Sequence, residues 1–255
     1  MKRVIAFIYG VICYVIFLAT FLYAVGFVAN VYVPKTIDNG GESGTLLISV
    51  VINILILGVF GLQHSIMARP GFKKWWTNII PKSVERSTYV LFSSLALMFV
   101  YWQWRPIPDL IWDTQAQSAR IALWALSGLG WFLVLTGTYM ISHWHLFGLK
   151  QVTENLKGEK PSPPKFMTPG YYQYVRHPLM LGFIIAFWAT PTMSIGHLLF
   201  AGVSTGYILV ALRFEERDLI RVFGDRYRRY KERVPGLIPI RFTGSEVEVE
   251  VEKPE

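Results

Sequence analysis

The residues best suited to chemistry lie in the stretch 170–239. Arg176 and His177 precede Pro178 where a basic loop enters apolar sequence, and Glu215–Glu216 stand where the last apolar stretch ends. Proline suits the first turn of a helix, because its missing N–H would be unpaired there in any case. A helix N-terminus beside an arginine attracts anions such as carboxylates or phosphates. Opposite charges gathered at one membrane face therefore predict a polar ligand bound at that face.

Each of these charged residues also has a simpler interpretation. A juxtamembrane arginine such as Arg176 can extend to lipid headgroups, and Glu216 can pair with Arg213 one helical turn away. Adjacent carboxylates on a helix point to different faces. We therefore expect Glu215 and Glu216 to differ in their surroundings, with one facing the bundle and the other facing water or an arginine.

Polar residues inside the apolar stretches are candidates for acid–base chemistry. Asn53, Phe60 and His64 share one face of a predicted helix, and polar groups within a membrane usually face the bundle interior. His64 is therefore either a helix-packing hydrogen-bond partner or a site residue. Tyr139 and His143 share a face of the stretch 120–142.

The sequence does not favour a metal site. Cys13 is the only cysteine, so an intrachain disulfide and a cysteine zinc site are excluded. The five histidines show no compact ligand spacing, although His143 and His145 stay a minor alternative for a metal or haem.

A membrane-spanning scaffold must position these residues. The chain has 255 residues, of which 53% are hydrophobic and 16% charged, against about 25% charged in typical soluble domains. A spanning helix needs about 20 mostly apolar residues. The candidate stretches are 4–29, 46–68, 88–104, 120–142, 177–190 and 196–213. We expect an all-α integral membrane protein with five to six transmembrane helices.

Two of these stretches, 4–29 and 177–190, have more than one interpretation. The first lacks a small-residue cleavage site, so we interpret it as a retained helix rather than a signal peptide. The stretch 177–190 is short and either crosses the membrane or forms a half-depth hairpin arm with 196–213.

Positive charge predicts the orientation. Of the 25 lysines and arginines, only Lys35, Arg105 and Arg120 fall in loops on the side opposite the N-terminus. Lysine and arginine concentrate on the cytoplasmic side. We expect both termini in the cytoplasm, with the protein in a bacterial inner membrane. Anionic lipid accounts for the net charge of +8, so a nucleic-acid partner is not expected, and the oligomeric state is left open.

The chain is predicted to form one domain over 1–242, with its ligand-binding core at about 143–239. The acidic segment 243–255 is too short to pack alone and is expected to be disordered. The proline-rich loop 150–169 is a candidate lid over the ligand.

Several motifs resemble known membrane methyltransferases. RHPLMLGF, followed about thirty residues later by EERDLIRVFGDRYRRYKERVPGLIP, resembles the isoprenylcysteine carboxyl methyltransferase superfamily, which uses S-adenosylmethionine and includes phospholipid N-methyltransferases. LQHSIMARPGFKKWW, ERSTYVL and HLFGLKQ resemble a narrower branch, which contains methanethiol S-methyltransferases and NnrU-type proteins linked to nitric oxide metabolism. One departure is Met180, where the family often has tyrosine.

The resemblance implies an S-adenosylmethionine site at the cytoplasmic face. The residues that it places around this cofactor are Lys150, Gln151, Tyr172, His177, Pro178, Leu181, Gly182, Glu215 and Glu216. It also implies methyl transfer to a small thiol, converting methanethiol to dimethyl sulfide. The alternatives are methylation of a lipid amine or a prenylcysteine carboxylate, and a non-catalytic NnrU-like protein.

A thiol must lose its proton to become the effective nucleophile. His64 is the first candidate for the base, with Tyr139, His143 and His145 behind it. Arg176 could stabilise the thiolate instead.

Overall fold

A computed structural model describes residues 1–42, 44–161 and 166–239. Its helices and strands, in chain order, are α1 (Lys2–Ala29), α2 (Leu46–Ala68), α3 (Pro70–Trp76), α4 (Lys82–Gln103), β1 (Leu110–Asp113), α5 (Gln117–Ile141), α6 (His143–Leu146), α7 (Leu149–Lys157), the 3₁₀ turn η1 (Gly170–Gln173), α8 (Pro178–Trp188), β2 (Thr192–Ser194), α9 (Ile195–Phe223) and α10 (Asp225–Arg233).

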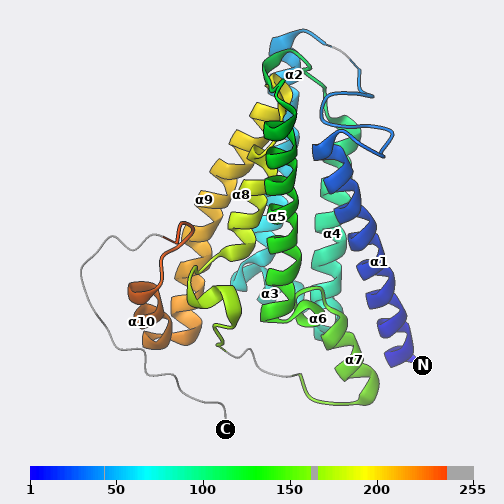
Figure 1. Cartoon of the computed structure of the whole chain (residues 1–255). Coiled ribbons are helices and arrows are strands. Elements are labelled where there is room, and N and C mark those ends of the chain that lie inside the picture. Colours follow the sequence, from blue (N-terminus) through cyan, green and yellow to red (C-terminus); the bar gives the residue numbers. More distant parts are fainter. Residues whose placement is uncertain (43, 162–165, 240–255) are drawn as a thin grey trace.

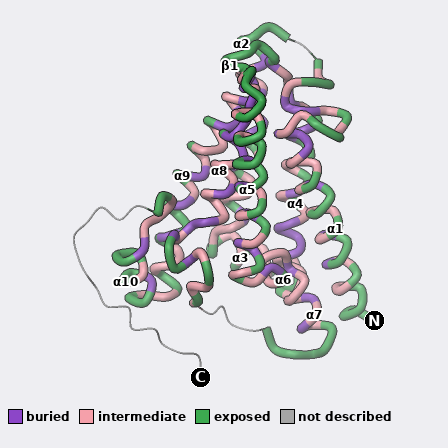
Figure 2. Tube along the Cα trace, in the orientation of Figure 1, coloured by how far each residue is buried: buried purple, intermediate pink, exposed green. Residues whose placement is uncertain are grey.

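The long helices run side by side as a bundle (Figure 1). Four of them, α1, α2, α5 and α9, are long and apolar enough to cross a membrane among the described residues. The loop after α1 and strand β1 lie at one end of the bundle, and α3, α6, α7 and α10 lie at the other. The outward faces of α1 and α5 are largely exposed (Figure 2), and they carry large apolar side chains. Such surfaces suit contact with lipid, so the chain is an all-α integral membrane protein.

Helices α4 and α8 coincide with the two other predicted stretches. Helix α4 has 22 residues and begins with charged residues, among them Glu85 and Arg86. Helix α8 has 11 residues; at 1.5 Å per residue it is about 16 Å long, roughly half the hydrocarbon thickness. Helix α8 alone is therefore too short to cross, and the number of crossings stays a prediction.

An aromatic core joins the helices near the β1 end. Phe27, Tyr101, Trp104 and Phe200 are buried in one cluster, with Phe27 and Trp104 rings edge-on at 5.9 Å between centroids. Edge-to-face pairs of this kind add to the stabilisation from buried area. This core fixes α1, α4 and α9 relative to one another.

Helices α5 and α8 approach each other through glycines. A Cβ atom on Gly130 would lie 2.6 Å from the Ala186 nitrogen, and one on Gly182 would lie 2.7 Å from the Gly130 carbonyl oxygen. Real Cβ atoms do not come so close to backbone, so both positions need glycine for helix packing. Gly182 faces α5, which gives it a role in helix packing, while its contact with a cofactor stays a prediction.

Three further features differ from the expectations or extend them. Strands β1 and β2 pair antiparallel, a short sheet that the apolar pattern does not predict. Helix α7 occupies the first part of the loop predicted at 150–169. The segment 162–165 within that loop and the predicted disordered tail 243–255 lie outside the described residues.

Candidate functional site

A buried carboxylate lies at the centre of the charged residues. Glu216 is 8% exposed, and its Oε1 accepts hydrogen bonds from Arg176 Nε at 2.8 Å and from His177 Nε2 at 3.1 Å. Its Oε2 lies 2.7 Å from Lys231 Nζ. Helix α9 supplies the carboxylate, the residues before α8 supply two partners, and α10 supplies the third. Removing one partner of a buried ion pair is strongly destabilising, so this cluster holds three segments together.

Backbone hydrogen bonds reinforce this junction. The Arg176 and His177 N–H groups donate to the carbonyls of Pro235 and Gly236 at 2.9 and 3.1 Å. Arg176 Nη1 donates to the carbonyls of Lys231, at 2.9 Å, and Val234. The C-terminal segment 231–236 therefore runs along the residues that begin α8.

The neighbouring carboxylate has different surroundings. Glu215 is exposed and makes no hydrogen bond or ion pair among the described residues. Its charge acts on the hydroxyl groups of Tyr89, Tyr172 and Tyr207, which come from α4, η1 and α9. Burial raises the pKa of the Tyr172 hydroxyl, and the charge of Glu215 raises it further. Glu215 is thus the acceptor of the pair that a ligand can reach.

One buried polar atom near the charged residues lacks a partner among the described residues. It is the Tyr227 hydroxyl, on a side chain that is 2% exposed, and the charges of Glu216, Arg176 and Glu215 all act on it. Buried polar atoms are usually hydrogen-bonded. This orphan hydroxyl, together with Glu215, fits a ligand that has both donors and acceptors, as the amino acid and ribose parts of S-adenosylmethionine do.

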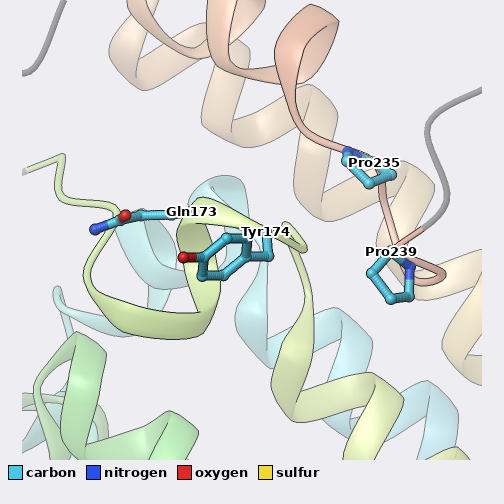
Figure 3. A pocket seen from close by; sticks show the side chains of 4 residues that line it. All are labelled: Gln173, Tyr174, Pro235 and Pro239. Atoms are coloured by element: carbon cyan, nitrogen blue, oxygen red, sulfur yellow. The ribbon is translucent and has the colours of Figure 1, made fainter. Parts of the chain in front are cut away.

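An open crevice adjoins this junction (Figure 3). Gln173 and Tyr174 line one side of it, and Pro235 and Pro239 line the other. Its volume is about 490 Å³. The crevice opens beside the backbone pairing of 176–177 with 235–236, so solvent reaches the edge of the charged cluster.

His64 lies against α4. Its Nε2 is 2.8 Å from the Tyr89 hydroxyl, and its Nδ1 is 3.1 Å from Ser93 Oγ. A neutral imidazole has one donor and one acceptor nitrogen, so one hydroxyl donates to the ring and the other accepts from it. Next to His64 on α2, Ser65 Oγ lies 3.1 Å from the Tyr207 hydroxyl of α9. The hydroxyls of Tyr89 and Tyr207, which contact α2 here, are also the ones on which the charge of Glu215 acts.

Arg86 connects this histidine to the turn after α5. Its guanidinium lies over the Tyr89 ring, 4.8 Å from the centroid, and its Nε donates to the Leu146 carbonyl at 2.6 Å. Burial and the charge of Arg86 lower the pKa of His145. The turn needs Gly148, because its φ is +89° and a Cβ there would lie 2.7 Å from the Ser87 nitrogen.

His143 and Tyr139 form a separate cluster. His143 is 5% exposed, with Nε2 at 2.8 Å from the Tyr14 hydroxyl and Nδ1 at 2.8 Å from Thr138 Oγ1. Tyr139 stacks on the His143 ring, with 4.2 Å between centroids, and it is 54% exposed. Both ring nitrogens of His143 have partners, which leaves neither free for a metal. Phe147, 4.8 Å from the His143 ring between centroids, packs against the buried cluster that contains Tyr89, so aromatic packing rather than hydrogen bonding separates His143 from His64.

The remaining residues that were predicted to bind the cofactor lie in two places, on α8 and beside the turn that Arg86 contacts. Pro178 is buried at the first turn of α8, as predicted. Leu181 is half-buried on the same helix. Lys150 pairs with Glu154 at 3.8 Å, and Gln151 Nε2 donates to the His145 carbonyl at 3.0 Å. Lys150 and Gln151 therefore lie with the Arg86 turn rather than on the Glu216 cluster.

The sequence interpretation missed several residues of the site. Tyr89 and Arg86 lie in the ERSTYVL motif, and Lys231 and Tyr227 lie in the basic segment after α9. The motif itself was the available signal for the first two. Nothing in the spacing distinguishes Lys231 from the other basic residues around it, because only the fold brings it to Glu216.

The comparisons with known proteins show which proteins the chain is similar to. Residues 52–214 match the family model described as NnrU protein. Methanethiol S-methyltransferase 1 of Bradyrhizobium diazoefficiens is 53% identical over 94% of this chain and 84% of its own length. Methanethiol S-methyltransferase of Mycobacterium tuberculosis is 54% identical over 94% of this chain and 98% of its own length. A nurim homolog of Drosophila pseudoobscura is 28% identical over 75% of the chain and 78% of its own length. No solved structure matches.

Proposed function

The chain belongs to the NnrU family, in the group of the methanethiol S-methyltransferases, and on that premise we propose that it transfers a methyl group to the sulfur of methanethiol. The observation that supports this most directly is an exposed carboxylate, Glu215, whose charge acts both on the orphan Tyr227 hydroxyl and on Tyr89, the hydrogen-bond partner of His64. The carboxylate and the orphan hydroxyl suit a polar methyl donor, and the histidine suits deprotonation of a small acceptor.

S-adenosylmethionine supplies an activated methyl group on a positively charged sulfur. Glu215 would accept hydrogen bonds from its amine or ribose hydroxyls, and the Tyr227 hydroxyl would gain the partner that it lacks. Glu216 holds Arg176, His177 and Lys231 in place, so its role is to position the residues at the start of α8.

His64 receives the thiol proton in this proposal. Its contacts with Tyr89 and Ser93 orient the ring, and the Arg86 cation over Tyr89 favours negative charge nearby. Orientation of donor and acceptor near contact distance supplies much of the remaining rate enhancement in a methyl transfer. Methanethiol is small and apolar and needs no polar entrance.

We also propose the predicted orientation. Both termini and the site would face the cytoplasm of a bacterial inner membrane, because Lys and Arg concentrate at that end of the bundle.

The test uses the full chain purified in detergent, with S-adenosylmethionine binding measured by calorimetry and dimethyl sulfide measured in the headspace after methanethiol is added. We expect the wild type to bind and to form product. Glu215→Gln should weaken binding about tenfold or more, since a hydrogen bond to a charged group contributes about 1.5–3 kcal/mol. Arg221→Gln is the matched control on α9, with a side chain that is 75% exposed.

The two measurements separate the ways in which the proposal fails. Binding without dimethyl sulfide would retain a methyltransferase and reject methanethiol as its acceptor. Absence of binding in the wild type would reject S-adenosylmethionine as the donor. Equal binding by Glu215→Gln and Arg221→Gln would remove Glu215 from the site.

A further inference from the structure

The end of the bundle opposite the candidate site has few cations. The loop after α1, the connection around β1, β2 and the first turn of α5 contain only three lysines and arginines, namely Lys35, Arg105 and Arg120. Two of these three, Lys35 and Arg105, line one pocket of about 290 Å³ together with Glu42 and Trp102. Like charges repel, so two cations gathered in one hollow need a reason.

The backbone of Arg105 is fixed by a buried amide. Asn53 is 0% exposed; its Nδ2 donates to the Arg105 carbonyl at 2.8 Å, and its Oδ1 accepts from the Arg105 N–H at 2.9 Å. This pair joins α2 to the end of α4. The guanidinium therefore projects from a rigid point rather than from a free loop.

Both cations have donors left for an anion. Arg105 Nη1 donates to Glu42, while its Nε is buried without a partner among the described residues. Lys35 Nζ donates once, to the Trp102 carbonyl at 2.5 Å, and an ammonium group has three donors. Burial and the charge of Arg105 lower the pKa of Lys35, as expected where positive charge exceeds negative charge.

Glu42 indicates what the pocket attracts. Its side chain is 83% exposed, and the hydrogen bond and charge of Arg105 lower the pKa of this carboxyl group. An exposed carboxylate gains little from a surface ion pair, so another anion can replace it at low cost.

Trp102 places the pocket at the level of lipid headgroups. This side chain is 69% exposed at the end of α4, and exposed tryptophans gather at the membrane–water interface. Arginine and lysine beside an interfacial tryptophan suit a phosphate group, whose oxygens match several N–H donors at once.

We propose that the pocket formed by Lys35, Arg105, Glu42 and Trp102 is a phosphate-binding site, with Lys35 and Arg105 donating to the phosphate oxygens in the place that Glu42 now occupies. The phosphate belongs to a lipid headgroup or is free in solution. This site is separate from the methyl-transfer site and does not depend on the proposed activity.

The experiment is native mass spectrometry of the full chain in detergent, titrated with short-chain phosphatidylglycerol. Lys35→Gln should weaken the first binding event about tenfold, because it removes a charge-assisted hydrogen bond. Glu42→Gln should strengthen it, because a competing carboxylate is lost. Arg120→Gln is the matched control, since Arg120 pairs with Asp113 at 3.1 Å outside the pocket and should leave the affinity unchanged.

A second arm adds inorganic phosphate at the same concentrations. Displacement of the lipid by phosphate would identify the phosphate group alone as the ligand, and retention of the lipid would identify the lipid headgroup. Equal affinity in wild type, Lys35→Gln and Glu42→Gln would overturn the proposal. If Lys35→Gln does not fold, Glu42→Gln decides alone: tighter binding supports the site, and unchanged or weaker binding rejects it.

Discussion

Two histidines near the same end of the bundle have opposite surroundings. Both His64 and His143 have hydroxyl partners on their two ring nitrogens. His143 is enclosed by aromatic rings, with Tyr139 stacked on it and Tyr14 edge-on to it. His64 lies beside Tyr89, over which the Arg86 cation lies and on whose hydroxyl the charge of Glu215 acts. Hydrogen bonding alone does not distinguish the two histidines, whereas nearby charge does, and this charge is why we propose His64 rather than His143 as the base.

The largest expected effect is on turnover at His64. His64→Ala should lower kcat about 10²–10⁴-fold, the range for loss of a general base, while S-adenosylmethionine affinity stays unchanged. Headspace dimethyl sulfide and calorimetry measure the two quantities. Retained turnover would mean that His64 serves helix packing, as we expect for His143, and is not the base.

His143→Ala should act on stability instead. It removes two hydrogen bonds and a stacked ring pair, and leaves the Tyr14 hydroxyl without its partner, while Thr138 Oγ1 keeps its bond to the Leu135 carbonyl. We expect a loss of about 2–3 kcal/mol, within the range for such disruption, with activity per folded molecule near that of the wild type. Thermal unfolding in detergent measures the first quantity. A loss of turnover without a loss of stability would place His143 in the chemistry.

Tyr89→Phe tests how His64 is oriented. It removes the hydroxyl 2.8 Å from His64 Nε2 and keeps the ring beneath Arg86. We expect kcat to fall about tenfold, equivalent to one hydrogen bond of about 1.4 kcal/mol. Tyr14→Phe, which removes the corresponding hydroxyl from His143, is the control and should leave kcat unchanged. Similar kcat values for the two variants would refute the orienting role.

The smallest expected effect is a pH dependence of stability. Burial lowers the pKa of His143, so below about pH 6.5 the unfolded chain binds a proton that the folded chain does not. The contribution of neutral His143 to stability should be fully present above that pH. It should decline as the pH falls towards the lowered pKa of His143 in the folded protein. His143→Gln should flatten the melting temperature between pH 7 and pH 5 relative to the wild type. An identical dependence of the melting temperature on pH in His143→Gln and in the wild type would contradict this prediction.

The gathering of Arg176, His177 and Glu216 at one end of the bundle was predictable because these residues lie in compact motifs, whereas the part played by Lys231 was not. Arg176 and His177 precede a helix-starting proline, and Glu216 ends the last apolar stretch. Membrane crossing then brings both segments to one end of the bundle. The different surroundings of Glu215 and Glu216 follow from helix geometry alone.

The remaining features depend on tertiary contacts that one sequence does not encode locally. Tyr89 reaches His64 only because α2 packs on α4, and Gly182 approaches Gly130 only because α8 packs on α5. Helix α8 is shorter than its apolar stretch because it ends at Trp188, before Pro191 and the pairing of β2 with β1. Tyr139 and His143 are expected on one helix face, but α5 ends before Ser142, and the two rings stack across that break.

The attachment of the 231–236 segment to Arg176, His177 and Glu216 has a consequence for biosynthesis. The four long apolar helices found among the described residues all precede residue 224, so they are synthesised before the 231–236 segment. Until that segment is added, Glu216 lacks Lys231, and the backbone N–H groups of Arg176 and His177 lack their acceptors. A chain cut before residue 231 would therefore keep its apolar helices for membrane insertion but have an unfinished site.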